Sequence, residues 1–267
     1  MSNKISTSII LPTLNEKDNL KLLIPNLIIE IQDTLADYEI IVVDDNSTDG
    51  TYEYITNLNK KNTKIKIYSR LDNPSLPMAI WDGINMAKME YVIWLDADGS
   101  MPPKTVAKLI NEQKENKNAV IIGSRFAPGG AYKGIQDISN DSIFTAIKNV
   151  RKSNDSVPGM ILSILFNYLL NFLHFGEIKD ITSGFLIGKK KYFKKELFSN
   201  SSYGEYFIHV CNYLIVKNIQ IIEIGYICET RISGTSKTAS NLIQLIQRGI
   251  PYITTAINSK REKYENL

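Results

Sequence analysis

The most constraining feature of this sequence is an alternation, through its first half, of short apolar runs rich in β-branched residues with longer segments of helical periodicity. The apolar runs occupy residues 8–11, 39–43, 64–68, 91–95 and 119–122. The helical patterns occupy residues 17–33, 49–58 and 78–88, and a fourth begins after Pro102 and Pro103. Strands that alternate with helices form right-handed βαβ units. The sequence therefore predicts an α/β fold with a Rossmann-like, mostly parallel sheet flanked by helices.

Beyond residue 126 the alternation is less regular. Glycine and polar residues at 127–141 predict a loop, and a helical pattern then extends to His174. Later strands are predicted at 184–187 and 219–224, and later helices at 203–216 and 239–257. The chain has no internal repeat and no long linker. Residues 1–240 are therefore expected to form one domain, followed by an amphipathic helix and a tail at 241–267.

One segment, residues 156–176, has no Asp, Glu, Lys or Arg, and it is nearly long enough to cross a bilayer. Its polar residues share one helical face: Ser163, Asn167, Asn171 and His174. This pattern favours a helix at a membrane interface, at a dimer contact or on a core. The first residues lack an apolar signal-peptide region and the chain has only two cysteines, so we expect a cytoplasmic protein.

Composition argues against two classes of function. A net charge of +3 is too small to indicate a nucleic-acid partner. Cys211 and Cys228 have no metal-ligand spacing, and the chain has only two histidines, which argues against a zinc site.

Polar residues gather immediately after three of the predicted strands. They are Pro12, Thr13, Asn15 and Glu16 after the first strand, Asp44 and Asp45 after the second, and Asp96, Asp98 and Ser100 after the fourth. Ligands of open α/β sheets bind beyond the carboxyl ends of the strands, and we expect these three strands to be neighbours. The clusters therefore predict one ligand site at that edge of the sheet.

Asp96 and Asp98 carry the clearest chemistry. They are two residues apart in an extended segment, so their carboxylates point the same way and repel each other unless a cation lies between them. Hard oxygen ligands suit Mg²⁺ or Mn²⁺, which shares its other positions with water and substrate phosphates. The alternative is that Asp98 or Ser100 caps the next helix. For Asp44 and Asp45, the alternatives are a nucleotide ligand and an Asx turn.

Six short motifs, taken in order, resemble the family 2 glycosyltransferases of the GT-A fold. Four lie in the first half: LPTLNE at 11–16, VVDDNSTDGT at 42–51, LDADGSMPP at 95–103 and IGSRF at 122–126. TSGF at 182–185 and ISGTSKT at 232–238 are similar to motifs of the polyprenyl-phosphate sugar transferases, the dolichol-phosphate mannose synthase branch. The resemblance extends over about residues 5–240.

The resemblance implies a role for each cluster. Residues 1–126 would be a nucleotide-binding half, with the nucleoside along Pro12, Thr13, Asn15, Glu16, Asp44 and Asp45. Asp96, Asp98 and, more weakly, Ser100 would hold Mg²⁺ or Mn²⁺ against the diphosphate of a nucleotide-sugar donor. Residues 127–240 would be an acceptor-binding half. The acceptor and the phosphates would be bound by Arg125, Ser183, Arg231, Ser236 and Lys237.

The chain departs from the family pattern in two places. Residues 73–79 read NPSLPMA, with two prolines, where many relatives have a glycine-rich run near the donor sugar. Ser100 is a short side chain where this branch often has a larger polar metal ligand. The sequence therefore leaves the sugar of the donor open.

The implied reaction is an inverting, metal-dependent transfer of a sugar to a polyprenyl phosphate. A lipid phosphate is already an anion and needs no general base. A sugar hydroxyl of a surface glycan, the alternative acceptor, needs one, and Glu205 stands where hydroxyl-using relatives place it. Glu205 equally fits an acidic residue that favours a helix N-terminus. A nucleotidyltransferase or a silent nucleotide-binding homologue is the alternative from another class, and the glycine-free segment after the first strand argues against the former.

A lipid acceptor also implies contact with a membrane surface. The helices at 157–175 and 239–257 and the lysines at 189–191, 194 and 195 are the candidate contacts, although a solvated helix face also explains the lysines. We expect peripheral association with the inner face of the plasma membrane, and a homodimer is a further possibility.

Overall fold

The computed structural model describes residues 4–71, 73–131, 157–173, 178–229 and 242–259 of the chain. The strands are β1 (Ser6–Thr13), β2 (Asp37–Asp44), β3 (Ile65–Ser69), β4 (Tyr91–Trp94), β5 (Val120–Ser124), β6 (Leu186–Lys189) and β7 (Ile221–Gly225). The helices are α1 (Lys17–Ile31), α2 (Thr51–Lys61), α3 (Leu76–Met86), α4 (Pro103–Glu115), α6 (Val157–Leu173), α7 (Glu196–Ser199), α8 (Tyr206–Val216), α9 (Leu242–Ser259) and a 3₁₀ turn, η1 (Lys190–Tyr192).

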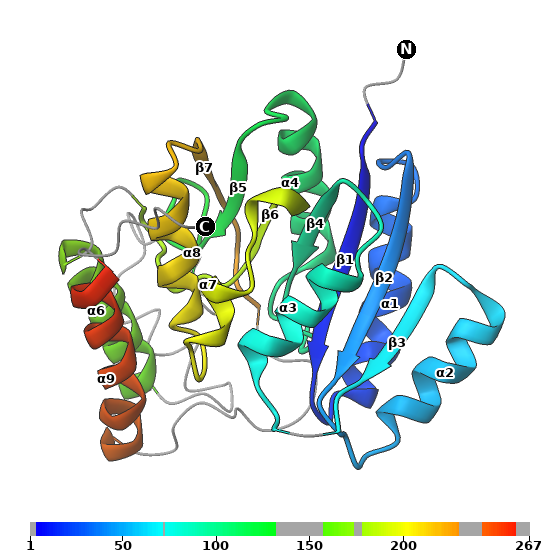
Figure 1. Cartoon of the computed structure of the whole chain (residues 1–267), viewed down its shortest axis with the longest axis horizontal. Helices are drawn as coiled ribbons and strands as arrows, with labels where there is room; N and C mark the ends of the chain where they lie inside the picture. The colour runs from blue at the N-terminus through cyan, green and yellow to red at the C-terminus, as the bar shows by residue number, and fades with distance from the viewer. Residues whose placement is uncertain (1–3, 72, 132–156, 174–177, 230–241, 260–267) are drawn as a thin grey trace.

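The strands join in one sheet in the order β3-β2-β1-β4-β6-β5-β7 (Figure 1). The first four strands pair in parallel, and β5 pairs in parallel with β7. β6 is antiparallel to both β4 and β5, so β4 and β5 run in the same direction. The predicted α/β fold with a mostly parallel sheet flanked by helices is confirmed.

Helices cover both faces of the sheet. Successive strand residues point to opposite sides, so an apolar strand needs a core on each side. Ile9 and Leu11 of β1 pack into a core with residues of α1, α2 and α4. Ile10, between them, packs into a second core with residues of α3, α7 and α8. Burial on both sides explains why the central strands are continuous apolar runs. The strand ends are then the part of the sheet where polar residues can meet a ligand.

The helices α6 and α9 pack against each other beside α8 (Figure 1). The ring of Phe166 in α6 meets the ring of Tyr252 in α9 nearly edge-on, with centroids 5.7 Å apart. The end of α9 is anchored to α8, because Ala256 is fully buried and the Asn212 amide donates to the Ser259 carbonyl at 2.6 Å. Within the described parts of the chain, no helix is both long enough and apolar enough to cross a membrane.

Two features of the segment from β6 to α8 were not predicted: the direction of β6, and the two short helices that follow it. β6 runs against its neighbours, and η1 and α7 precede α8. A short apolar run has no intrinsic direction, since direction is decided by the strands with which it pairs. Most of the predicted loop at 127–141, the helical pattern before residue 157 and the predicted tail lie outside the described residues.

Candidate active site

The candidate active site lies along the sheet edge where the parallel strands end. Thr13 and Asp44 are paired as the last residues of β1 and β2. Asp96 follows β4, which is the other neighbour of β1, and Arg125 follows β5. Because these four strands run in the same direction, the residues lie along one edge, as the clusters predicted. Pro12 lies within β1, beside Val43 of β2.

Hydrogen bonds join the loops that follow β1 and β2. Asn15 has a φ of 55°, a left-handed conformation that its short amide side chain tolerates. Its backbone N–H donates to Ser47 Oγ at 2.7 Å, and its Oδ1 accepts from the Thr48 N–H at 2.8 Å. Glu16, just before α1, accepts from the Asn19 amide. Two motifs more than thirty residues apart thus form one polar wall.

Asp44 makes the local turn that was the alternative interpretation of the acidic pair. Its carboxylate accepts from the Ser47 hydroxyl, and its Oδ2 accepts from the Ser47 N–H at 3.2 Å. Asp44 is almost completely buried at the end of β2. These bonds fix the carboxylate beside Asn15, and its role toward a nucleotide stays a prediction.

Asp45 anchors the proline-containing segment after β3. Its carboxylate accepts from the Arg70 guanidinium and, at 2.8 Å, from the Ser75 N–H. Arg70 Nε also donates to Asp82 at 2.9 Å. Burial raises the pKa of Asp45, and the bonds from Ser75 and Arg70 offset only part of this effect. The wall near the predicted donor sugar is thus held by an ion-pair network rather than by glycines.

Asp98 and Ser100 do not cap the helix that follows, because Pro102 occupies the N-cap position of α4. Instead, Asp98 Oδ1 accepts from the Ser100 N–H at 2.9 Å, and Gly99 between them has a φ of 82°. The Ser100 carbonyl accepts from the Glu229 N–H at 2.9 Å, which ties this loop to the segment after β7. The local bonds therefore shape a tight loop that carries both aspartates.

The donor set of this loop fits a hard divalent cation. It consists of two carboxylates and a hydroxyl, from Asp96, Asp98 and Ser100. The described residues contain no group of three His, Cys, Asp or Glu that would enclose a metal. Mg²⁺ sites commonly use one or two carboxylates and complete their shell with water and substrate phosphates. The residues thus fit an ion that is held jointly by the protein and a bound diphosphate.

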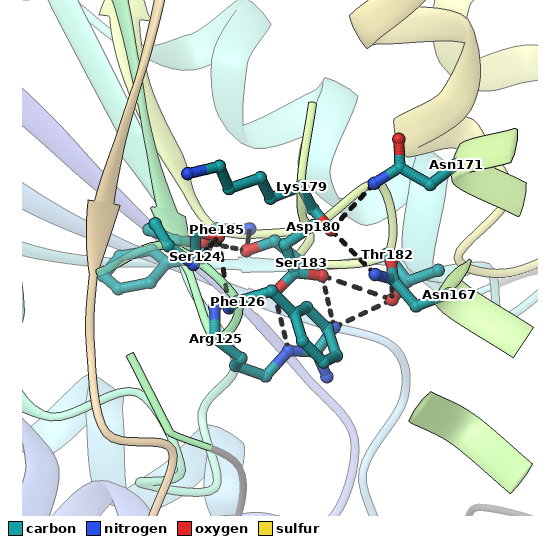
Figure 2. A network of polar contacts seen from close by, with 12 residues as sticks. Ser124, Arg125, Phe126, Asn167, Asn171, Lys179, Asp180, Thr182, Ser183 and Phe185 are labelled. Atoms are coloured by element: carbon teal, nitrogen blue, oxygen red, sulfur yellow. Dashed lines mark hydrogen bonds and ion pairs between the residues drawn. The ribbon is translucent and has the colours of Figure 1, made fainter. Parts of the chain in front are cut away.

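Arg125 is held by a neighbouring carboxylate, as Figure 2 shows. Its Nε and Nη2 donate to the two oxygens of Asp180 at 2.8 and 2.7 Å, and its backbone N–H donates to Asp180 at 2.9 Å. Nη2 also donates to Thr182 Oγ1 at 2.8 Å. Asp180 is fully buried. This bidentate pair fixes the guanidinium plane at the end of β5.

Ser183 and Glu205 are both buried and have local partners. The Ser183 hydroxyl donates to the Gly123 carbonyl, which joins the 178–185 segment to β5. Glu205 Oε1 accepts from the Ser202 N–H at 2.6 Å and from the Ser202 hydroxyl at 2.7 Å. Its Oε2 accepts from the Tyr203 N–H at 3.1 Å. Arg231, Ser236 and Lys237 lie outside the described residues, so their roles stay predictions.

Sequence reasoning missed three side chains near these residues. Asp180 is one of them. Tyr206 accepts from the Trp94 indole at 3.1 Å, and burial raises the pKa of its phenol, with Asp96 adding to the effect. Tyr252 of α9 is the third: burial raises its pKa, with the nearby Tyr203 and Glu205 adding to the effect. Only Asp180 had a usable signal, since it lies two residues before the TSGF motif.

Comparison with known proteins identifies the family. A sequence model described as "Glycosyl transferase family 2" matches residues 8–197, which include each described cluster after β1, β2, β4 and β5. The chain belongs to this family. The predicted family is confirmed, and so is the GT-A fold, by similarity to solved structures.

The relatives with similar sequences include two dolichol-phosphate mannosyltransferases. That of Saccharomyces cerevisiae is 36% identical over 47% of this chain, and that of Pyrococcus furiosus is 36% identical over 58% of it. The chain spans slightly less than half of the length of these relatives, 46% and 45%. The predicted resemblance to this branch agrees with these matches.

The solved structures with similar folds include glucosyl-3-phosphoglycerate synthase from Mycobacterium tuberculosis. One structure of it, with phosphoglyceric acid, has a TM-score of 0.62 at 16% identity and covers 96% of this chain and 80% of its own. Another, with Mn²⁺, uridine diphosphate and phosphoglyceric acid, has a TM-score of 0.63 at 17% identity, with coverages of 96% and 78%. At this identity the likeness establishes the fold.

Proposed function

We propose that this protein transfers a sugar from a nucleotide-sugar donor to a polyprenyl phosphate at a membrane surface, with inversion at the anomeric carbon and with Mg²⁺ or Mn²⁺. The observation that carries the proposal is the meeting of the three acidic and polar clusters and Arg125 at one sheet edge. The two dolichol-phosphate mannosyltransferases support the acceptor class. The Mn²⁺ and uridine diphosphate bound by the structural relative support metal use.

In this proposal the nucleotide-binding half, residues 1–126, holds the donor. The nucleoside lies along the wall formed by Asn15, Glu16 and Asp44, and the Arg70–Asp45 network shapes the space for the sugar. Asp96 and Asp98 hold the divalent ion, with Ser100 beside them. When bound there, the ion supplies Lewis-acid stabilisation of the charge that develops on the leaving diphosphate.

The acceptor phosphate binds at Arg125, which lies beside the boundary between the two halves. Arg231, Ser236 and Lys237 of the acceptor-binding half, residues 127–240, contribute further cationic and polar groups. A phosphate oxygen attacks the anomeric carbon on the face opposite the leaving nucleoside diphosphate, which inverts its configuration. The phosphate is an anion at neutral pH, so it needs no group to remove a proton. We place this step at the inner face of the plasma membrane, where a polyprenyl phosphate is accessible.

The local bonds of Glu205 favour a phosphate over a hydroxyl acceptor. A general base must accept a proton from the acceptor within hydrogen-bond reach. The Glu205 carboxylate already accepts three bonds from Ser202 and Tyr203. These bonds hold it in the turn before α8, where it occupies the N-cap position without a capping bond from its side chain. Glu205→Gln should therefore retain near-normal turnover, whereas a loss of 100-fold or more would favour a hydroxyl acceptor.

The proposed donor site is tested by thermal shift with UDP, GDP, CDP and dTDP, each with and without Mn²⁺. A ligand at 100 times its Kd stabilises a fold by about 2.7 kcal/mol, which raises Tm measurably. We expect a metal-dependent rise with one nucleotide, whose sugars then become the donors to assay with undecaprenyl phosphate in vesicles. No rise with any nucleotide would contradict the donor site, and turnover with sugar acceptors alone would contradict the acceptor.

A further inference from the structure

The ion pair between Arg125 and Asp180 is buried, and three hydrogen bonds join its two residues. Asp180 is fully buried, and the Arg125 side chain is 13% exposed. Taking both charges out of water costs free energy that their attraction only partly returns, so a buried pair is weak support for stability. The pair does, however, fix a geometry, because a carboxylate that binds Nε and Nη2 together allows one orientation of the guanidinium plane.

Asp180 is itself held from behind by β7. The two oxygens of Glu223 accept from the backbone N–H groups of Lys179 and Asp180 at 2.8 and 3.0 Å. The carboxylate of Asp180 therefore sits on a backbone segment that a neighbouring strand fixes. The orientation of Arg125 is thus determined by β5 on one side and by β7 on the other.

The same segment is clasped by α6 (Figure 2). The buried Asn167 donates to the Lys179 carbonyl at 2.7 Å, and Asn171 donates to it at 3.1 Å. Thr182, which accepts from Arg125, lies 3.4 Å from Asn167 Oδ1. Asp180 and Thr182 together engage Nε and Nη2 of Arg125. The segment that holds the guanidinium is thus itself held by α6 and by β7.

We propose that Asp180 is a positioning residue: it fixes the guanidinium plane of Arg125 in the orientation in which this side chain meets the acceptor phosphate. The bond from Nη2 to Thr182 limits rotation of the guanidinium out of that plane. An arginine held in place before the ligand arrives loses less side-chain freedom on binding, which favours a tight complex. The inference rests on the proposed function for the identity of the acceptor, but not for the orientation of Arg125.

The test compares Asp180→Asn, Thr182→Val, Arg125→Ala and the double variant Arg125→Ala/Asp180→Asn. Glu90→Gln is the matched control, since it removes the carboxylate of an exposed ion pair with Lys189 at 3.4 Å. Acceptor KM is measured with farnesyl phosphate and donor KM with the nucleotide sugar that the thermal-shift panel identifies. Thr182→Val removes one acceptor and keeps the pair, so it remains informative if Asp180→Asn fails to fold.

For Asp180→Asn we expect the acceptor KM to rise about tenfold, which corresponds to losing the preorganisation of one side chain, and the donor KM to stay within about twofold. Thr182→Val should raise the acceptor KM by a smaller factor. The double variant should be no worse than Arg125→Ala alone, because Asp180 acts through Arg125. Additive losses, or an equal rise in the donor KM, would overturn the inference.

A readout without turnover separates this inference from the proposed function. If the wild-type protein shifts with a nucleotide but does not use farnesyl phosphate, the proposed acceptor is wrong. The orientation of Arg125 is then judged from its Nε–H resonance in ¹⁵N NMR spectra, assigned by its loss in Arg125→Ala. We expect a slowly exchanging resonance in the wild type and in Glu90→Gln, and its loss in Asp180→Asn. Its persistence in Asp180→Asn would overturn the positioning role.

Discussion

At the scale of single residues, the aspartates of the site differ in their burial and in their hydrogen-bond partners. Asp44, Asp45 and Asp180 are buried and accept hydrogen bonds from neighbouring loops, so they shape the walls. Asp96 is more exposed and lies beside Asp98 in a tight turn. Asp98 is itself buried and accepts from the Ser100 N–H, so of the two proposed metal ligands only Asp96 differs from the wall residues in exposure.

Asp98→Asn tests the metal site with little change in shape. The amide oxygen can still accept from the Ser100 N–H, so the fold should persist, but the lost charge should weaken metal binding. We expect the Mn²⁺-dependent rise in Tm with the nucleotide to disappear and kcat to fall by roughly 100-fold or more. Asp18→Asn, at an exposed position of α1, is the control. Unchanged metal dependence in Asp98→Asn would contradict the assignment.

Glu39 lies near the start of β2, at the end of the strand away from the site, and its charge is expected to stabilise the fold. Burial would raise its pKa, but hydrogen bonds from Lys66, Ser8 and the Lys88 N–H outweigh burial and lower it. A lowered pKa stabilises the fold above the unfolded-state value, about 4.3, and this contribution is lost as the pH falls through the folded-state pKa.

Glu39→Gln should therefore lower the free energy of unfolding by about 1–3 kcal/mol at pH 7. The difference from the wild type should shrink below about pH 4, as the wild-type carboxyl becomes protonated. Chemical denaturation at pH 7 and pH 3.5 measures both values, with the exposed Glu53→Gln as the control. A difference that stays constant with pH would show that charge does not contribute.

At the scale of elements, α9 is the last described helix, and its Tyr252 lies near Gly204 and Glu205. A Cβ added to Gly204, in the turn before α8, would overlap the hydroxyl of Tyr252 in α9. The electrostatic neighbours of that hydroxyl include Glu205, Arg125 and Asp96. The predicted amphipathic helix is thus packed against the turn that carries Glu205.

Gly204→Ala tests this contact between α8 and α9. The added methyl group should displace the Tyr252 ring and lower the free energy of unfolding by about 1–3 kcal/mol, as overpacking does. The loss in Gly204→Ala/Tyr252→Ala should be smaller than the sum of the two single losses, because the added methyl group no longer meets the ring. Both values come from denaturant unfolding. A double variant whose loss equals the sum of the two single losses would contradict the contact.

At the scale of the whole molecule, α6 and α9 lie together at one end of the fold (Figure 1). Both helices expose apolar side chains. The described side chains on these helices that are large, apolar and exposed are Tyr168, Leu169, Phe172, Ile250 and Ile257. If the proposed acceptor is a membrane lipid, these helices are the expected contact with the bilayer surface.

Phe172→Asp tests that contact, since Phe172 is 84% exposed. Co-sedimentation with vesicles that contain anionic lipid should fall about tenfold, because an inserted aromatic side chain is lost and a negative charge is added. Ile29→Asp is the matched control, because Ile29 is 63% exposed on α1, on another part of the surface. Equal binding of the two variants would remove α6 from the membrane contact.

Local sequence patterns were sufficient for the first half of the fold and for the composition of the site. The apolar runs became β1 to β5, and the motifs after them lie at one edge, because parallel strands that alternate with helices must end on the same side. The sequence left open whether Asp98 caps the next helix. The structure shows that it bonds to the Ser100 N–H within its own loop instead.

Tertiary structure alone decided how the second half completes the site. The antiparallel insertion of β6 between β4 and β5 depends on pairing between segments far apart in the chain. The Arg125–Asp180 pair joins residues 55 positions apart, and Tyr252 reaches Gly204 from another helix. Such contacts have no sequence period, since they arise only when packing brings distant segments together. The sequence by itself determined which groups are present and on which edge, and the packing determined which way each of them faces.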